Sequence, residues 1–446
     1  MTLRARIADL PLLVVCVLLL STAADILPND TIVGVGEVQL NLARLLLLAG
    51  LAAFVIAHGL RVSHWRAGIG LPLLLLLGVS LYSSHKWGTY PRFRFLLEAV
   101  VAFYLTFAVT RIRGEARDAL VTVGLVALAI ASLTAVAQVA QSVHTGFYRD
   151  GCKPLTLTPG IDPPSGSLTR ATGTFANPNV LAGYLLLLLP IGAMASVYVT
   201  RLRGLWAAVA LGGGLGFLSL VFTFSRAAVL MSLVALALGI LISDLKSRRW
   251  LLLVVVLLAV AIGVLAGSCG SDATAGYGRS EEWSATMKVI GDYPDWGVGL
   301  GRLGFVLHAR DPASSAQHAH NLFLTWWAEA GTGALVAWIW IFAALVWRSL
   351  RGALRTGSVA ARVGLVALVG FLGMSMLDHP ANVDRVALAF WIVAGFAAAS
   401  GDPARSWLRR RRGDGAEPLT AAIKGEHAAS LADRPRSGNV KPLPRE

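Results

Sequence analysis

Two histidines and an asparagine stand where a polar loop runs into an apolar stretch. His318, His320 and Asn321 directly precede residues 322–328, LFLTWWA. Titratable groups at the edge of a bilayer are costly to desolvate and usually mark a site. An imidazole with an ordinary pKa of about 6.5 can remove a proton from a hydroxyl group at neutral pH. We therefore interpret this segment as the source of a general base.

Two other interpretations of the histidines stay open. They could be a pair of metal ligands, because histidine is the commonest metal-binding side chain. However, no third ligand stands at helical spacing and neither HExxH nor CxxC occurs in the chain, so we expect no metal. In a structural role, each imidazole would instead bond to a loop carbonyl.

Arg226 is a candidate anion-binding side chain. It follows residues 223–225, TFS, at an expected helix boundary with almost no loop, so it should lie near membrane depth. An arginine there needs a partner. Guanidinium binds phosphate oxygens bidentately, which favours a fixed phosphate-binding cation. Snorkelling of the side chain to the interface is the structural alternative.

Arg279 opens a second candidate segment. Within residues 279–290, Trp283, Met287 and Ile290 recur at helical spacing. This spacing predicts a short amphipathic helix that lies at the membrane interface. Surface pairing of Arg279 with Glu282 is the structural alternative to a binding role.

Residues 170–179, RATGTFANPN, lead into another apolar stretch. Asn177 suits the N-cap of a helix and Pro178 its first position, which explains both residues structurally. Capping leaves Arg170 and Asn179 unexplained. We keep Arg170, Asn177 and Asn179, together with Asn321, as supporting site residues.

Charged residues also gather between the last two apolar stretches. They are Asp378, His379, Asp384 and Arg385. We expect an internal ion pair among them, with a supporting role behind the site as the minority hypothesis.

The composition predicts an all-α, polytopic integral membrane protein. Of 446 residues, 56% are hydrophobic and 14% are charged, whereas soluble proteins carry about 25% charged residues. A spanning helix needs about 20 apolar residues, and twelve stretches approach that length. They cover residues 10–27, 41–60, 68–84, 95–110, 118–142, 173–199, 205–223, 227–243, 250–267, 321–347, 361–377 and 385–400. We interpret the first as a retained helix rather than a signal sequence.

The net charge of +14 is distributed in a pattern typical of membrane topology. With the N-terminus inside, most lysines and arginines fall in cytoplasmic connections and in the C-terminal tail. This positive-inside pattern predicts that both termini are cytoplasmic. Residues 409–412, RRRR, would then contact anionic lipid. Membrane lipids are therefore expected partners, and nucleic acid is not.

Two outward segments are long, at about residues 143–172 and 268–320. Long ordered connections are uncommon unless they are functional. We predict a transmembrane domain over residues 1–400, with a large outward loop at 268–320, and a disordered basic tail over 401–446. Cys152 and Cys269 both face outward in this topology, so a disulfide and two free thiols both stay open.

Taken together, these segments resemble the O-antigen ligase/polymerase superfamily of bacterial membrane glycosyltransferases. The resemblance covers about residues 170–345 strongly and the rest of the chain by topology. The matching pieces, in the family's order and spacing, are residues 173–179 (GTFANPN), 225–226 (SR), Arg279 with Trp283, 294–301 (PDWGVGLG) and 318–321 (HAHN).

The resemblance implies a fold like the C-type membrane glycosyltransferases, in the bacterial inner membrane. It implies a donor glycan on undecaprenyl pyrophosphate, presented on the periplasmic side, and no metal, nucleotide or other cofactor. His320 would be the base, with His318 the weaker candidate, and Arg226 and Arg279 would hold the pyrophosphate. Positioned arginines can stabilise the charge that develops on this leaving group. A single displacement would invert the anomeric carbon.

Four functions stay open within these bounds. We favour an O-antigen ligase, which moves a whole glycan onto lipid A–core, chiefly because of the resemblance. A polymerase of O-antigen or exopolysaccharide would share the same residues and join lipid-linked repeat units. A transporter or flippase with Arg226 and His320 in its pathway would favour charges inside several helices, and these are nearly absent. Transfer of glycan to protein lies within the range of the superfamily.

Overall fold

The computed structural model describes residues 3–24, 33–35, 38–141, 170–175, 177–198, 205–242, 273–312 and 316–401. These residues belong to one unit, Met1–Gly401. The expected helix at 250–267, most of the loop at 143–172, Cys152, Cys269 and the tail lie outside the described residues. Whether Cys152 and Cys269 form a disulfide therefore stays open, and the disordered tail stays a prediction.

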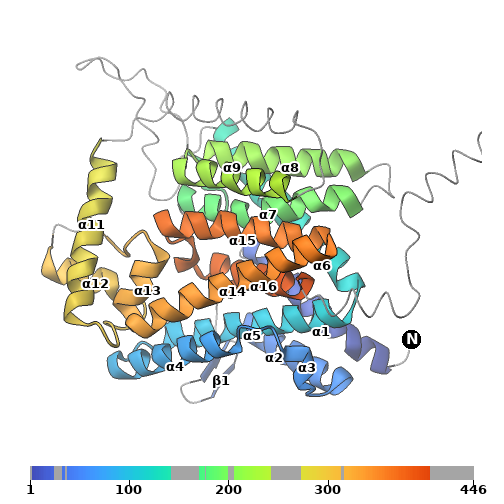
Figure 1. The fold of residues 1–446 in the computed structure, drawn as a ribbon, viewed down its shortest axis with the longest axis horizontal. Helices are drawn as coiled ribbons and strands as arrows, with labels where there is room; N and C mark the ends of the chain where they lie inside the picture. The colour runs from blue at the N-terminus through green and yellow to red at the C-terminus, as the bar shows by residue number, and fades with distance from the viewer. Residues whose placement is uncertain are drawn as a thin grey trace, which may run out of the picture. The chain divides into compact units, whose positions relative to one another are not determined.

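The described part of the chain is almost entirely helical (Figure 1). Its helices are α1 (Leu3–Ala24), α2 (Leu42–His58), α3 (Val62–Trp65), α4 (Gly70–Trp87), α5 (Tyr90–Ile112), α6 (Glu115–Ala140), α7 (Pro178–Tyr198), α8 (Leu205–Phe222), α9 (Arg226–Leu241), α11 (Ala273–Asp292), α12 (Leu303–Arg310), α13 (Leu322–Ala330), α14 (Thr332–Thr356), α15 (Val359–Leu377), the 3-10 turn η3 (Pro380–Asn382) and α16 (Asp384–Ser400). The sequence did not predict the short antiparallel hairpin of β1 (Val33–Val35) and β2 (Val38–Leu40).

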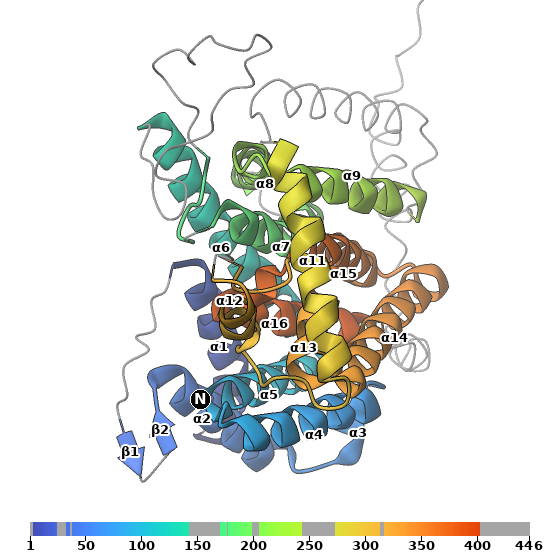
Figure 2. The same ribbon diagram turned by 90° about the vertical axis from the view of Figure 1, so that its left-hand side faces the viewer.

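Most of the apolar helices run side by side, and three other helices lie at one end of them. Figure 1 shows α11, α12 and α13 gathered at the left-hand end, and Figure 2 shows α11 crossing that end. Hydrogen bonds join the connections at the same end. The segment before α7 bonds to the last residues of α1, α6 and α8 and to the first turn of α16. We call this end of the bundle the site end.

Helix α16 is the centre of the bundle. Every residue from Ala389 to Ser400 is buried, because α16 packs against α1, α5, α7, α14 and α15. A helix that is apolar on all sides can be stable only when it is surrounded in this way. Its first turn therefore holds the turn Asp378–Asn382 in a defined place at the site end.

Five described helices are long and apolar enough to cross a membrane. They are Ile7–Ala24, Tyr90–Ile112, Glu115–Ala140, Thr332–Thr356 and Val359–Leu377. Four more apolar helices are shorter: Leu42–His58, Pro178–Gly192, Gly213–Phe222 and Arg226–Leu241. The described residues thus support a multi-pass helical membrane protein, and the number twelve stays a prediction.

The predicted tenth helix, residues 321–347, is wrong as a single element. The chain forms α13, breaks at Gly331 and continues as α14. Gly331 has φ +83 and ψ −178, a conformation that is essentially open only to glycine. A Cβ at this position would lie 2.0 Å from the Asp295 carbonyl oxygen. The break occurs because the loop before α12 packs directly on the backbone at Gly331.

We expect Gly331→Ala to destabilise the protein by at least about 2 kcal/mol, because both the backbone conformation and the collision oppose a side chain. Thermal unfolding of the detergent-purified protein measures this. Gly291→Ala in α11 is the matched control, since nothing lies within 4 Å of its Cβ and alanine favours a helix. Equal unfolding temperatures for the two variants would contradict the role of Gly331.

Candidate active site

The histidine segment is anchored by Asn321. Its side-chain oxygen accepts a hydrogen bond from the Leu324 N–H at 3.0 Å, so Asn321 is the N-cap of α13. Its amide nitrogen donates to the Met376 carbonyl at 2.8 Å, which ties the start of α13 to the last turn of α15. Asn321 therefore positions the segment through hydrogen bonds on both sides.

His320 has a backbone conformation that few side chains adopt. Its φ is +45, in the left-handed region that costs most residues about 1–2 kcal/mol. In this conformation its N–H donates to Nδ1 of His318 at 3.1 Å, and the two rings lie 4.4 Å apart. Burial, followed by the charge of His320, lowers the pKa of His318 to about 4. His318 is therefore neutral near pH 7.

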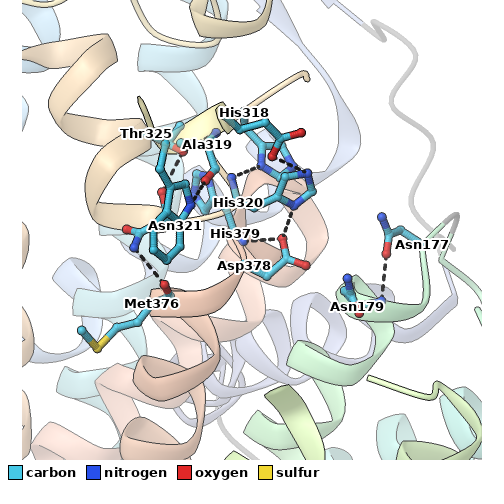
Figure 3. Close-up of polar contacts among 12 residues, drawn as sticks. Asn177, Asn179, His318, Ala319, His320, Asn321, Thr325, Met376, Asp378 and His379 are labelled. Carbon is cyan, nitrogen blue, oxygen red and sulfur yellow. Dashed lines mark hydrogen bonds and ion pairs between the residues drawn. The ribbon is translucent and has the colours of Figure 1, made fainter. Parts of the chain in front are cut away.

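Asp378 lies directly beside His320. Figure 3 shows the carboxylate facing the imidazole, with 3.0 Å between Oδ1 and Nδ1. Asp378 is nearly fully buried, and the same oxygen accepts a hydrogen bond from the His379 N–H at 2.7 Å. Burial disfavours both charges, but their hydrogen bond outweighs it, so the pKa of His320 is raised and that of Asp378 is lowered. The pair is arranged to stabilise an imidazolium beside a carboxylate.

Helix α11 brings a second carboxylate to the other side of His320. Oε2 of Glu282 lies 3.8 Å from Nε2 of His320. The next residue, Trp283, donates from its indole N–H to the Ala319 carbonyl at 2.7 Å, which fixes α11 to the histidine segment. Burial raises the pKa of Glu282, while the charges of His320 and Arg279 oppose that rise.

Arg279 lies one helical turn before Trp283 on α11. Its positive charge opposes the rise in the pKa of both Glu282 and His320. Arg279 therefore interacts electrostatically with both side chains of the site. The predicted helix at 279–290 is confirmed and is longer than expected, since α11 spans Ala273–Asp292.

Arg226 is the exposed first residue of α9. Helices α9 and α15 pack antiparallel: Met231 lies against Gly373, and Gly239 lies against Val366. Because both helices advance by about 1.5 Å per residue, this register brings Arg226 to the level of Asp378. Packing thus brings Arg226 to the same depth of the bundle as the His320–Asp378 pair.

Arg170 and Asn177 have structural roles beside the site. Nε of Arg170 donates to the Thr223 carbonyl at 3.1 Å, which holds residues 170–175 to the turn before α9. The Asn177 side chain accepts from the Asn179 N–H at 2.8 Å, so the predicted cap of α7 is confirmed. Figure 3 shows Asn177 and Asn179 on the first turn of α7, separate from the histidine cluster.

The predicted ion pair within the charged turn between the last two helices is wrong, because its two acids pair with residues outside that turn. Asp384 pairs with Arg92 at 2.9 Å, and Asp378 pairs with His320. Arg385 donates to the Thr174 carbonyl at 2.7 Å and lies over the ring of Phe175. The partners differ because helices distant in the sequence are nearer in space than the charged neighbours along the chain.

The structure brings a third group with a possible metal-binding atom, Asp378, beside the two histidines. Donor atoms of His318, His320 and Asp378 lie within 4.8 Å of one another, a geometry that a metal ion could use. Within the cluster, however, Nδ1 of each histidine already takes part in a hydrogen bond. We retain the prediction of metal-free chemistry and give its test below.

Sequence reasoning missed the two carboxylates that flank His320. The sequence predicts Glu282 only as a partner of Arg279, and it predicts Asp378 as a member of an internal ion pair or, in the minority hypothesis, as a supporting residue. One signal was present in the sequence: an Asp-His pair at the end of an apolar stretch, where a buried acid needs a partner. Nothing in the sequence indicates which histidine that partner is, because 58 residues separate Asp378 from His320.

Residues 211–339 match the model of a protein family described as O-antigen ligase. This segment is less than a third of the chain and contains Arg226, Arg279, Glu282 and both histidines, but not Asp378. No curated protein matches the chain. The match agrees with the order of the motifs and with the site at the end of a helical bundle: over residues 211–339 the chain is similar to the O-antigen ligase family.

Proposed function

We propose that this protein is an O-antigen ligase that transfers a glycan from undecaprenyl pyrophosphate to a hydroxyl group of lipid A–core. The observation that carries the proposal is the His320–Asp378 pair at the site end, with Nε2 of His320 on the side away from the carboxylate. An imidazole held in this way is suited to take a proton from an incoming hydroxyl group.

In the proposed reaction, the acceptor oxygen attacks the anomeric carbon of the donor sugar. The new carbon–oxygen bond forms as the bond to the pyrophosphate oxygen breaks, and the electron pair leaves with the pyrophosphate. The acceptor proton passes to Nε2 of His320. A single displacement inverts the anomeric carbon.

Asp378 supports the base in two ways. By accepting from Nδ1–H, it selects the tautomer whose Nε2 carries the lone pair. Its negative charge then stabilises the imidazolium that forms. Glu282, 3.8 Å from Nε2, stands where the acceptor approaches and can accept a hydrogen bond from a neighbouring hydroxyl group.

Arg226 and Arg279 would receive the charge of the leaving pyrophosphate. Guanidinium groups bind phosphate oxygens through paired, charge-assisted hydrogen bonds. Arg279 acts on His320 electrostatically, and Arg226 begins α9 at the level of Asp378. Two fixed cations of this kind can replace a metal ion in stabilising the transition state.

The charge distribution supports a periplasmic site in the bacterial inner membrane. Arginines gather in and beside the connections at the opposite end of the bundle. Those described are Arg61, Arg66, Arg111, Arg113, Arg117, Arg348, Arg351, Arg355 and Arg362. From the positive-inside rule we infer that this end is cytoplasmic. In that topology the site end and His320 would lie at the periplasmic face and both termini in the cytoplasm.

Deleting the gene and analysing both glycan pools tests the function. A ligase deletion should give bare lipid A–core together with long glycans that accumulate on undecaprenyl pyrophosphate. Core that carries a single repeat unit would identify a polymerase instead. If neither pool changes, the protein acts on another polymer or on protein, or it transports lipid-linked glycan, and the proposal is wrong.

Transfer activity is expected to survive a strong chelator, because arginines rather than a cation hold the leaving group. The measurement compares turnover of the purified protein before and after treatment with EDTA. Loss of activity that is restored by adding a divalent metal would contradict the metal-free mechanism and would point to the donors of His318, His320 and Asp378.

A further inference from the structure

A cavity lies beside α12, and neither His320 nor Asp378 lines it. Its volume is about 540 Å³, within the range of about 300–1,000 Å³ that is typical of small-molecule sites. Phe305 and His308 line it from one face of α12, and Gln317 lines it from the turn before the histidines. The cavity therefore borders the segment that carries the proposed base.

A smaller recess of about 60 Å³ adjoins this cavity. The two share the lining residues Arg92, Gly301, Glu329 and Asn382. The recess is otherwise lined mostly by apolar and aromatic side chains, and by His379 and Asp384. The cavity thus has a polar mouth and a largely apolar interior with one imidazole.

The buried imidazole of His379 indicates that the recess binds a ligand. It is 5% exposed, and its Nδ1 has no hydrogen-bond partner among the described residues. Burial lowers the pKa of His379 well below its usual value, so the ring is neutral. A buried polar atom without a partner is unfavourable, and a ligand hydroxyl group in the recess would satisfy it.

The polar lining does not favour an anion. Arg92 already pairs with Asp384 at 2.9 Å. Burial raises the pKa of Glu329 to about 7. Near neutral pH this carboxyl is therefore partly protonated and is compatible with an uncharged ligand. The carboxamides of Gln317 and Asn382 both donate and accept, and the ring of Phe305 is 68% exposed. Donors and acceptors around an open aromatic face suit a hydroxyl-rich sugar ring rather than a pyrophosphate.

We propose that this cavity is a subsite for an uncharged sugar of the acceptor glycan. The proposal rests on the glycosyl transfer proposed above and names where the acceptor binds. Gln317 is three residues before His320, so their Cα atoms are at most about 11 Å apart. His379 contacts the ring of His318, and its N–H donates to Asp378. A glycan seated in the cavity would present a neighbouring sugar to the base.

The test measures binding, which needs no turnover. The full-length protein in detergent is titrated with core oligosaccharide released from the lipopolysaccharide of an O-antigen-deficient strain. Replacing Phe305→Ala and His308→Ala together should weaken its binding about tenfold, through loss of an aromatic contact and a polar one. Binding of the lipid-linked donor should stay unchanged. Arg310→Ala is the matched control, because Arg310 is on the same helix and pairs with Asp292 outside the cavity.

His379→Phe gives a second, independent measurement. It keeps a ring of similar size and removes the nitrogen that lacks a partner, so the unfolding temperature should not fall while oligosaccharide binding weakens. Unchanged oligosaccharide binding in both variants, or weaker binding of the lipid-linked donor alone, would overturn the proposal. If the wild-type protein binds the oligosaccharide and the variants do not, the subsite stands even where the deletion experiment rejects ligase function.

Discussion

Replacing His320 with alanine is expected to reduce glycan transfer by at least about 10²-fold, and up to about 10⁴-fold, the usual contribution of a general base. The reason is that Asp378 holds Nδ1 of His320, which leaves Nε2, near Glu282, to take the proton of the approaching acceptor. The measurement is turnover of lipid-linked donor by the purified variant. His318→Ala should lower turnover less, because the pKa of His318 lies far below 7 and its Nδ1 accepts from the His320 N–H.

Two controls separate loss of the base from loss of the fold. Donor binding to His320→Ala should remain, since the arginines that hold pyrophosphate are unchanged. His85→Ala should leave turnover intact, because His85 is exposed and bonds to Tyr90 at the end of α4. Near-normal turnover in His320→Ala would remove His320 as the base.

Asp378→Asn should lower turnover by about 10²-fold or more and shift its pH dependence. The amide cannot favour the imidazolium, and its N–H₂ group can donate to Nδ1 and select the wrong tautomer. In the native protein the pKa of His320 is raised by Asp378. The neutral imidazole is the active form, so activity rises as pH increases through that pKa. Without the carboxylate the pKa falls, and the acid limb of the residual activity should move to lower pH.

The pH profile distinguishes a positioning role from damage to the fold. Asp292→Asn is the matched control, because Asp292 is an exposed acid that pairs with Arg310, and its profile should equal that of the wild type. A uniform loss of activity in Asp378→Asn with no movement of the acid limb would mean that Asp378 does not act through His320.

Local patterns predicted individual elements well. The spacing of Trp283, Met287 and Ile290 predicted a helix that the structure confirms as α11. Asn177 and Pro178 predicted the start of α7. Both predictions succeed because helical periodicity and capping depend on residues three or four positions apart, which a sequence displays directly.

Predictions that depended on distant neighbours failed. The stretch 321–347 looks continuous because its apolar residues continue through Gly331, yet the loop at Asp295 packs on that backbone and breaks the helix. The expected ion pairing around Arg385 failed for a similar reason. Asp384 forms an ion pair with Arg92 instead, and Arg92 lies near it only because α16 packs against α5.

The sequence by itself determined the class of protein, the positions of most helices, and the side chains that could act as base and as phosphate ligands. Those properties follow from composition, periodicity and side-chain chemistry. Only the tertiary structure decided which groups surround the base. Asp378 reaches Nδ1 because α13 is tied to α15 through Asn321, and Glu282 reaches Nε2 because Trp283 fixes α11 to Ala319. These contacts depend on how helices pack, and packing is a sum over many distant residues that no local pattern records.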